Sequence, residues 1–486
     1  MELESDSMNW ETVIGLEVHV ELSTKSKIFC SCTTAFGGEP NTHVCPVCSG
    51  MPGSLPTLNR AVVEYAVRVG LALNCSITRV NKFDRKNYFY PDLPKAYQIS
   101  QLYAPICRDG HIVIETGDYN KIIAIREIHM EEDAGKLIHD QKTGGTQIDF
   151  NRCGVPLLEI VSQPDLRNSR EALAYLKKLR EILLYLGVSD CKMQEGSMRA
   201  DVNLSIRPMG GELGVRTEMK NLNSFKAIGR AIEYETKRQI EVLESGGHIV
   251  QETRRWDDDK SVSYNMRSKE DAQDYRYFPE PDLLPIEIED AWLAHIKSSL
   301  PELAHQKRER YQRDLGLSEY EASVLTVHKN ISDLFEAVSD ECGEPLEAAH
   351  LITGEIMRLL NQTNTLPEEL SLDKHKLSYL VSLVLRGKIN RSAYKEAIEA
   401  VFTSNCDPEA YIVENGLMMK SDDSVISESV DSVLSENPDA VSGYRAGREK
   451  AFVFLMGQVM KKLGGAGDPD AARRILNEAL AQDDET

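Results

Sequence analysis

The sequence has no long apolar run and no N-terminal targeting pattern. Charged residues such as Arg68 and Arg386 interrupt its most apolar stretches, so no segment is long enough to span a bilayer. Residues 1–6 are acidic overall, whereas a secretory or transit peptide begins with basic residues. These absences predict a cytoplasmic protein without a membrane partner.

Basic residues are scarce relative to acidic ones. The chain has 56 Lys and Arg against 77 Asp and Glu, a formal net charge of -21 over 486 residues. Because phosphate contacts come mainly from Lys and Arg, such a chain must bind nucleic acid through a local basic patch. Its 41% hydrophobic content is ordinary for globular domains with apolar cores, and its length suggests about three of them.

Several familiar catalytic motifs are also absent. The chain has no GxxxxGK[ST] phosphate loop, no GxGxxG turn, no HExxH pair and no GxSxG elbow. If the protein uses a nucleotide, acidic residues and a divalent cation must therefore hold it.

Residues 15–22 alternate strictly between polar and apolar side chains. In a β-strand this period of two places Glu17, His19 and Glu21 on one face and apolar residues on the other. The apolar face can be buried in a core while the other presents oxygen and nitrogen ligands. The pattern favours a metal or phosphate site.

Residues 127–133 repeat this pattern, with Glu127, His129 and Glu131 on one face. Two such strands side by side would concentrate negative charge that a cation neutralises. The alternative is a pair of ordinary edge strands with solvated faces. Solvated faces usually mix Lys, Thr, Ser and Arg with their acids, so the metal hypothesis is favoured.

Ten cysteines are present, and four of them are clustered. Cys30 and Cys32 form a CxC pair, and Cys45 and Cys48 form a CxxC pair. Clustered cysteines in a long intracellular chain bind metal more often than they form disulfides. Four thiolates suit the tetrahedral preference of zinc, and a closed four-sulfur site has a structural role. His43 is an alternative ligand, because a CxC pair is less usual in such sites.

Residues 1–292 are rich in strand patterns, with helices predicted at 60–73 and 169–186. Ser169 is the predicted N-cap of the second helix, which should end at Gly187. This mixture lacks regular βαβ alternation, so we expect an α+β fold: a large mixed domain with an antiparallel sheet.

The remainder of the chain is predicted to be helical. Residues 293–405 form the expected second domain, and residues 406–486 form a small tail domain. In the tail, an apolar stripe at helical spacing runs through Phe452, Leu455 and Val459.

The tail also contains the best local basic patch. Two short helices with basic outer faces could dock on a nucleic-acid backbone, and the alternative is a small bundle with solvated charges. The basic residues include Arg445, Arg448, Lys450, Lys461, Lys462, Arg473 and Arg474.

Residues 84–95 are dense in cations, aromatic residues and prolines. Such a stiff loop is suited to lining a binding channel. A buried connector with salt bridges explains the same composition equally well.

Many motifs along the chain together resemble one known family, the GatB subunit of the aspartyl/glutamyl-tRNA(Asn/Gln) amidotransferases. The similarity extends through the helical zone into the tail, so it covers nearly the whole chain. The motifs are residues 10–21, 29–32, 84–98, 131–136, 149–161, 217–225, 275–283 and 454–460.

The resemblance implies one member of a heterotrimer that converts Glu-tRNA(Gln) or Asp-tRNA(Asn) into Gln-tRNA(Gln) or Asn-tRNA(Asn). In this family ATP activates the side-chain carboxylate of the mischarged amino acid, with Mg²⁺ neutralising the phosphates. An amidase partner, the glutaminase of the complex, releases ammonia from glutamine, and a small third subunit joins the two. The ammonia travels through a channel closed to bulk water.

The resemblance also implies roles for individual residues. Since Glu131 and Glu132 are adjacent, they can share a face only at a bulge or at the end of the strand. The implied metal-site residues are Glu17, His19, Glu131 and Glu132, with Glu195 and Asp201 as further ligands, and Lys86 is the implied polar residue of the ammonia channel.

Two other features match the family. The four clustered cysteines match its zinc-bearing branch, whose zinc is not essential to the chemistry because other members lack the second pair. The tail resembles the family's tRNA-binding tail domain, which is YqeY-like. Two alternatives are a zinc-stabilised, non-catalytic RNA-binding module and the archaeal-type subunit that acts on Glu-tRNA alone. The second normally carries a large inserted domain for which this chain has no room.

Overall fold

The computed structural model describes residues 9–140, 144–268, 274–419, 423–464 and 467–482. The chain forms two compact units, Met1–Leu303 and Ala304–Thr486. The boundary predicted after residue 292 lies inside α4 (Asp290–Ser298), which belongs to the first unit. Trp292 of α4 explains this, because its indole donates to Glu64 of α1 at 3.1 Å and Arg60 stacks on its ring at 4.5 Å.

The first unit is built around a nine-stranded sheet of the described residues. Every neighbouring pair is antiparallel except β12 and β13, which are parallel. The order is β14 (Val262–Ser268), β13 (Glu252–Asp257), β12 (Thr217–Lys220), β11 (Met198–Pro208), β1 (Trp10–Glu21), β10 (Pro156–Ser162), β7 (Asn120–Glu132), β6 (Cys107–Glu115) and β2 (Ser76–Ile77).

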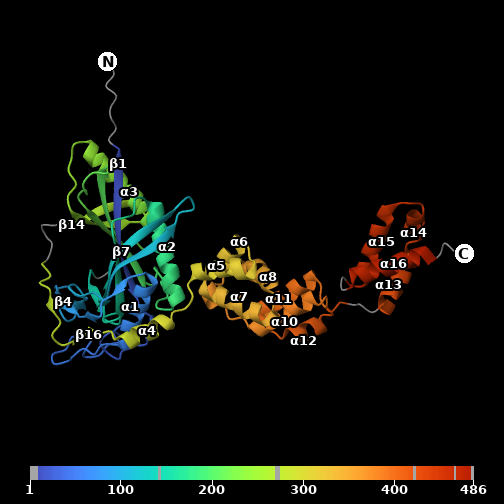
Figure 1. Ribbon diagram of the computed structural model, residues 1–486, viewed down its shortest axis with the longest axis horizontal. Helices are drawn as coiled ribbons and strands as arrows, with labels where there is room; N and C mark the ends of the chain where they lie inside the picture. Colours follow the sequence, from blue (N-terminus) through green and yellow to red (C-terminus); the bar gives the residue numbers. More distant parts are fainter. Residues whose placement is uncertain (1–8, 141–143, 269–273, 420–422, 465–466, 483–486) are drawn as a thin grey trace, which may run out of the picture. The chain divides into compact units, whose positions relative to one another are not determined.

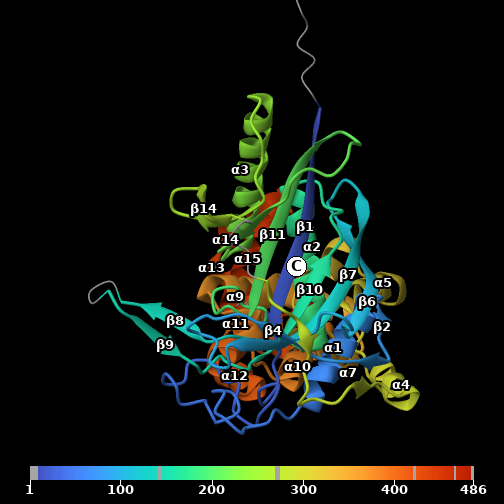
Figure 2. The ribbon, with the colours of Figure 1, turned by 90° about the vertical axis from the view of Figure 1, so that its left-hand side faces the viewer.

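β1 has the two faces that its sequence predicts. Val18 and Val20 are fully buried, while Glu17, His19 and Glu21 are partly exposed. β1 and β7 are not neighbours, because β10 lies between them; Figure 2 looks onto these strands, with β11 on the other side of β1.

Three helices cover the apolar face of the sheet (Figure 1). They are α1 (Arg60–Ala72), α2 (Ser169–Leu186) and α3 (Phe225–Glu244), so both predicted helices are confirmed. The N-cap of α2 is Asn168 rather than the predicted Ser169, because the Asn168 side chain accepts from Glu171 N. α2 ends as predicted at Gly187, which adopts φ 66°.

A small sheet lies against the end of β7. Its strand order is β15 (Phe278–Pro279), β4 (Asp84–Asn87) and β5 (Tyr97–Ser100), and β5 packs on β7. Two further pairs complete the unit: β3 (Val80–Asn81) with β16 (Ile286–Glu287), and the hairpin of β8 (Lys136–His139) with β9 (Thr146–Asp149). The hairpin projects from the sheet in Figure 2.

The second unit is helical in its described residues and contains two apolar cores. The first core is formed by α5 (Ala304–Leu315), α6 (Glu319–Leu325), α7 (Lys329–Cys342), α8 (Pro345–His350), a π-helix (Leu351–Ile356), α9 (Met357–Thr363), α10 (Lys374–Leu385), α11 (Arg391–Ser404) and α12 (Pro408–Glu414). The second is formed by α13 (Asp423–Glu436), α14 (Pro438–Arg445), α15 (Glu449–Lys462) and α16 (Pro469–Gln482). Because Ile412 is buried in the first core, α12 packs with the helices before it rather than with the tail.

The predicted α+β class is confirmed: a mixed domain with a mainly antiparallel sheet is followed by a helical region. Within the described ranges, every helix is too short or too polar to cross a bilayer.

Candidate functional site

Three potential metal ligands meet on the polar face of the sheet. His19 of β1, Glu159 of β10 and Glu131 of β7 offer ligand atoms that all lie within 4.8 Å of one another. His19 Nε2 is 3.7 Å from Glu131 Oε1 and 4.0 Å from Glu159 Oε1. Ser100 Oγ of β5 donates to the other Glu131 oxygen at 3.2 Å. One imidazole with two carboxylates is a donor set that suits a divalent cation.

A second acidic cluster lies beside the first. Glu17 of β1, Asp201 of β11 and Glu218 of β12 also offer oxygens within 4.8 Å of one another. Asn203 Nδ2 donates to Glu17 Oε1 at 2.9 Å. Lys220 Nζ lies 2.6 Å from Asp201 and 2.9 Å from Glu218, so it is the internal counter-ion of this cluster. Oxygen ligands of this kind suit Mg²⁺.

Both clusters hold carboxyl groups whose ionised form is disfavoured. Burial raises the pKa of Glu17, and the charges of Glu159 and Glu218 raise it further. Burial also raises the pKa of Glu131, again with help from Glu159. A bound cation reverses both effects, because it favours the ionised carboxylate. The crowded carboxylates of the polar face therefore favour the binding of cations.

Glu21 lies further along the same face of β1. Burial and the neighbouring charge of Asp133 raise the pKa of Glu21 to about 8. Asp133 stays ionised, because Arg199 and Arg152 outweigh the effect of burial and lower its pKa. Arg199 donates to Asp133 at 2.9 Å. This end of the face is thus neutralised by arginines.

Two of the implied metal-site residues lie elsewhere. Glu132 is outside both clusters, and its Oε1 pairs with Lys95 and accepts from Ile99 N of β5 at 2.9 Å. The register of β7 with β10 is regular here, so there is no bulge, and Glu132 is the last residue of the strand. Glu195 lies in the turn before β11 and accepts from Lys192 at 3.0 Å.

Lys86 of β4 lies among tyrosines near the first cluster. Its Nζ is 4.8 Å from the centre of the Tyr275 ring and 5.7 Å from that of Tyr88. Its charge lowers the pKa of Glu131, although burial dominates that residue. Tyr277 packs on Tyr275, and its pKa is raised by burial and by the charges of Glu159 and Glu131.

The predicted loop 84–95 has the salt bridges of a connector, one of the two roles that its composition suggested. It contributes β4 and a buried ion pair, in which Arg85 donates to Glu280 at 2.7 Å. It also presents Lys86 and Tyr88 beside the acidic face.

The four clustered cysteines converge as predicted. The sulfurs of Cys30, Cys32, Cys45 and Cys48 all lie within 4.8 Å of one another, and those of Cys45 and Cys48 are 3.9 Å apart. Zinc bound at about 2.3 Å to each sulfur requires separations of about 3.8 Å, so the geometry fits. Hydrogen bonding from Cys30 lowers the pKa of the Cys48 thiol to about 4. We call residues 30–48 the knuckle.

His43, the alternative ligand, is not part of the cysteine cluster. Its ring packs against Gly38, and its backbone N–H donates to Asn151 at 2.8 Å. Asn41 donates to the carbonyl of Ile148 at 3.0 Å, so the knuckle is fastened to β9 and the loop that follows it.

The basic residues of the tail lie on its surface. Lys462 pairs with Glu436 at 2.5 Å, which neutralises part of the predicted patch. The apolar stripe is buried at Leu455 and Val459, as its spacing predicts. Arg445, Arg448, Lys450, Lys461 and Lys462 are all exposed.

One cavity of about 200 Å³ adjoins the Glu17 cluster. Its walls include Glu17, Arg126, Ser162, Gly214 and Arg216. Arginine side chains are donors that suit phosphate groups, and carboxylates such as that of Glu17 suit a cation.

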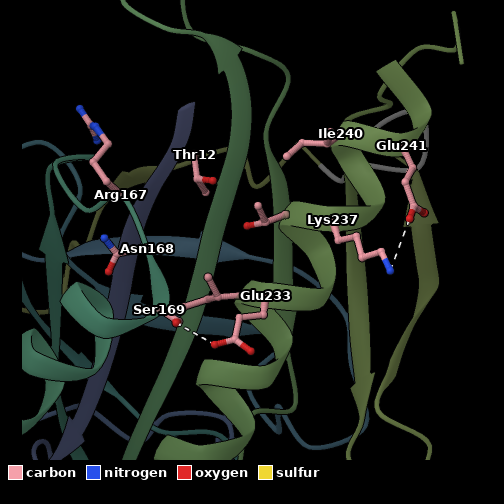
Figure 3. A pocket seen from close by; sticks show the side chains of 10 residues that line it. Thr12, Arg167, Asn168, Ser169, Glu233, Lys237, Ile240 and Glu241 are labelled. Atoms are coloured by element: carbon pink, nitrogen blue, oxygen red, sulfur yellow. Dashed lines mark hydrogen bonds and ion pairs between the residues drawn. The ribbon is translucent and has the colours of Figure 1, made fainter. Parts of the chain in front are cut away.

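A larger cavity of about 490 Å³ lies between β1 and the helices α2 and α3, on the opposite face of the sheet (Figure 3). Its rim includes the contacts of Ser169 with Glu233 at 3.0 Å and of Lys237 with Glu241 at 3.7 Å. It contains none of the predicted site residues.

The sequence interpretation missed Glu159 and Glu218. Glu159 is the one acid of β10, which is otherwise largely apolar, and Glu218 is the one acid of the short strand β12. An isolated charge in a buried strand, such as Glu159, is a signal of function because it is costly without a partner, whereas Glu218 has Lys220 beside it in the same strand.

Two family patterns match the chain. The pattern described as the GatB/GatE catalytic domain matches residues 12–294, and the pattern described as the GatB domain matches residues 333–480. The first covers both acidic clusters and the knuckle.

Full-length relatives give the same result. Proteins named as B subunits of aspartyl/glutamyl-tRNA(Asn/Gln) amidotransferases from Lachnoclostridium phytofermentans and Agathobacter rectalis are 59% and 56% identical to the chain. Each alignment covers 97% of this chain, and 99% and 100% of the respective relative. The protein of that name from Caldicellulosiruptor bescii is 56% identical over 97% of this chain and 99% of its own length.

Proposed function

The chain belongs to the GatB/GatE family, and on this premise we propose that it is the activating subunit of a glutamine-hydrolysing aminoacyl-tRNA amidotransferase. Its substrates are Glu-tRNA(Gln) or Asp-tRNA(Asn), and its products are Gln-tRNA(Gln) or Asn-tRNA(Asn). The observation that carries the proposal is the polar face of the sheet, where two carboxylate clusters lie side by side.

The reaction requires activation of a carboxylate. At neutral pH the side-chain carboxylate of the esterified amino acid repels nucleophiles and has no good leaving group. Transfer of the γ-phosphoryl group of ATP to this carboxylate gives an acyl phosphate, from which ammonia displaces phosphate. Mg²⁺ supplies neutralisation of the phosphate charges, and the residues that would hold it are His19, Glu131 and Glu159 in one cluster and Glu17 and Asp201 in the other.

We place the nucleotide phosphates in the cavity beside Glu17. Arg126 and Arg216 lie in its wall and supply planar donors for phosphate oxygens. The cavity adjoins the Glu17 cluster and lies along the sheet from the His19 cluster, so a triphosphate there could reach both. The regular antiparallel register of β1 with β11 fixes the spacing of these carboxylates before any ligand arrives.

Ammonia must reach the acyl phosphate in its neutral, unprotonated form, because ammonium ion is not a nucleophile. We assign Lys86 and the tyrosines around it to the wall through which ammonia reaches the activated carboxylate. A positively charged side chain in this wall disfavours entry of ammonium ion and leaves neutral ammonia as the permeant species. Tyr275 and Tyr88 lie against the Lys86 ammonium group, and Tyr277 packs on Tyr275.

We assign tRNA binding to the tail. One face of α15 exposes Lys450 and Lys461 together with Val453, Phe454 and Gly457. These residues are spaced at 3, 4, 7 and 11 from Lys450, so they form one stripe. Cations that contact phosphates, with an aromatic ring between them, suit the backbone and bases of RNA.

The remaining parts of the proposal follow from this activity. The chain itself contributes no glutaminase site to the proposal, so a partner amidase would release ammonia and a small third subunit would join the two. Zinc in the knuckle has a structural role, because a site of four thiolates is closed to substrate. Since the substrates are aminoacyl-tRNAs, we place the reaction in the cytoplasm.

A zinc-stabilised RNA-binding module without catalysis is disfavoured by the same face of the sheet. Glu159 and Glu218 add to the acids that its sequence predicted, and carboxylates repel phosphates unless a cation intervenes. An RNA-binding face would carry Lys and Arg there instead.

The test uses the complex purified with its partner proteins. His19→Ala should abolish ATP-dependent phosphorylation of mischarged tRNA, measured by transfer of labelled γ-phosphate, while glutamine hydrolysis persists at least partly. His111→Ala is the matched control, because this exposed histidine lies on β6. Phosphorylation that survives unchanged in His19→Ala would refute the proposal, and comparing both mischarged tRNAs identifies the preferred substrate.

A further inference from the structure

A buried lysine lies directly behind the knuckle. Lys27 is 0% exposed and is among the largest fully buried side chains of the described residues. Its Nζ donates to the carbonyl of His43 at 2.7 Å and to Cys48 Sγ at 3.6 Å. Within the described ranges no carboxylate forms an ion pair with it, although buried ammonium groups normally need an anion.

The sulfur that Lys27 contacts belongs to the candidate zinc site. Four thiolates around one Zn²⁺ carry two more negative charges than the metal neutralises. Cys48 Sγ also accepts from Cys45 N at 3.2 Å, so two donors converge on it. The buried cation and the surplus negative charge of the metal site lie at hydrogen-bond distance from each other.

We propose that Lys27 is the resident charge partner of the metal site, whose ammonium donates to the Cys48 thiolate and makes the burial of the tetrathiolate centre favourable. Lys27 is a positioning residue and not a ligand, because an ammonium group has no lone pair for the metal. It acts on the metal through the sulfur, as outer hydrogen-bond donors do in other metal sites.

The same pair of side chains lies against Gly154, whose backbone is hydrogen-bonded to the residue that follows β7. Gly154 adopts φ +81°, and a Cβ at this position would lie 3.5 Å from both Cys48 Cβ and Lys27 Cδ. Gly154 N donates to the carbonyl of Asp133, which follows Glu132 directly, and Gly154 O accepts from Ile28 N, each at 2.9 Å. Lys27 and its metal site therefore support the backbone that positions the end of β7.

The alternative is that Lys27 only fills space. Its long aliphatic stem packs against Gly154, and a methionine of similar length would fill the same volume. The two explanations differ in one respect: only a charge partner changes the properties of the bound metal.

The experiment measures metal binding to the full chain in its purified complex, without tRNA, ATP or glutamine. Zinc is titrated against a chromogenic chelator in the wild type, in Lys27→Met and in the matched control Lys25→Met, whose side chain is exposed. Lys27→Met should weaken zinc binding by about 10- to 100-fold, the usual effect of losing an outer hydrogen bond. Lys25→Met should leave the affinity unchanged.

Substitution with Co²⁺ gives a second measurement on the same proteins. Loss of the hydrogen bond to Cys48 should move the thiolate-to-cobalt charge-transfer band to lower energy while the tetrahedral ligand-field bands remain. An unchanged band together with unchanged zinc affinity in Lys27→Met overturns the proposal. Neither measurement depends on catalysis, so failure here leaves the proposed amidotransferase function untouched.

A double variant keeps the test decisive if Lys27→Met folds poorly. Cys48→Ser removes the anion and leaves the ammonium buried without it, so adding Lys27→Met to Cys48→Ser should raise the thermal midpoint above that of Cys48→Ser alone. If Lys27→Met lowers the midpoint equally in both backgrounds, Lys27 is a space-filling residue and the proposal is wrong.

Discussion

His19 Nε2 lies 3.7 Å from Glu131 Oε1, although β10 separates the strands that carry these two residues. Strands two positions apart in a sheet are about 10 Å apart, so the two side chains must lean toward each other over the strand between them. Glu159 is the residue of β10 at that point, and it is paired in register with His19 and with His129. It therefore occupies the centre of the cluster.

Glu159→Gln should weaken Mn²⁺ binding to the complex by at least about tenfold, because it removes a charged oxygen from the centre of the site. The measurement is electron paramagnetic resonance of free Mn²⁺ during titration, and tRNA phosphorylation should fall in parallel. Glu115→Gln, at the exposed end of β6, is the control. Equal Mn²⁺ affinity in both variants would exclude Glu159 as a ligand.

Lys86→Met should separate amidation from activation. The variant keeps the acidic clusters, so phosphorylation of the mischarged tRNA and glutamine hydrolysis should persist. Formation of amidated tRNA from glutamine should fall by at least about tenfold, because without the positive charge of Lys86 ammonium ion can enter the wall in place of neutral ammonia. Lys82→Met is the neighbouring control, and loss of phosphorylation in Lys86→Met would show that Lys86 acts in activation instead.

Local periodicity predicted the faces of the sheet, and long-range pairing could not be predicted in the same way. The faces predicted from the alternation around Glu17 and His19 are confirmed, because this prediction depends only on one strand whose apolar side is buried. The insertion of β10 between β1 and β7 depends on pairing between residues more than a hundred positions apart, such as Glu17 with Val161. No pattern within either strand encodes that choice.

The same reasoning separates the two adjacent acids of β7. Alternation alone indicates that Glu131 and Glu132 cannot share a face of a regular strand, and the register of β7 with β10 is regular at this point. The resemblance to the family placed both in one metal site. The partner of Glu132 is Lys95, the last residue of the loop 84–95, for which the composition suggested salt bridges but not their partners.

Glu132→Gln should act mainly on stability. It leaves Lys95, whose side chain is 11% exposed, without its carboxylate, so we expect a loss of about 3 kcal/mol in the free energy of unfolding of the first unit. Adding Lys95→Met should recover part of this loss, because no charge is then left unpaired. Urea unfolding measures both effects. A tenfold loss of Mn²⁺ affinity with unchanged stability would identify Glu132 as a ligand.

Glu235 of α3 should make the stability of the first unit depend on pH in the acid range. It is 0% exposed and accepts from Arg238 at 2.6 Å, from Gln239 at 2.8 Å and from Thr217 at 2.9 Å. Burial raises its pKa, but these donors prevail and hold it below the usual 4.5. The ionised form therefore contributes stability above pH 4.5, and this contribution is lost as the pH falls through the lowered pKa of the folded state.

Glu235→Gln should consequently lower the free energy of unfolding by about 3 kcal/mol at pH 7, and by less as the pH falls below 4.5. Urea unfolding across this range provides the measurement. Glu241→Gln, on the exposed side of the same helix, should show neither effect. A difference between wild type and Glu235→Gln that stays constant with pH would contradict the assigned charge state.

At Gly457 of α15, the residue that would make the helix more stable should also weaken the proposed binding of tRNA. It lies in the middle of a helix, and a Cβ built on it meets no atom within 4 Å. Gly457→Ala should therefore stabilise the tail by about 0.5–1 kcal/mol, because alanine loses less backbone entropy on folding. If the stripe around Phe454 docks on tRNA, the added methyl group should also weaken tRNA binding, measured by filter binding at several salt concentrations. Ser435→Ala, at an exposed position of α13, is the control for helix stabilisation alone. A more stable Gly457→Ala with wild-type tRNA affinity would move the RNA contact away from this face.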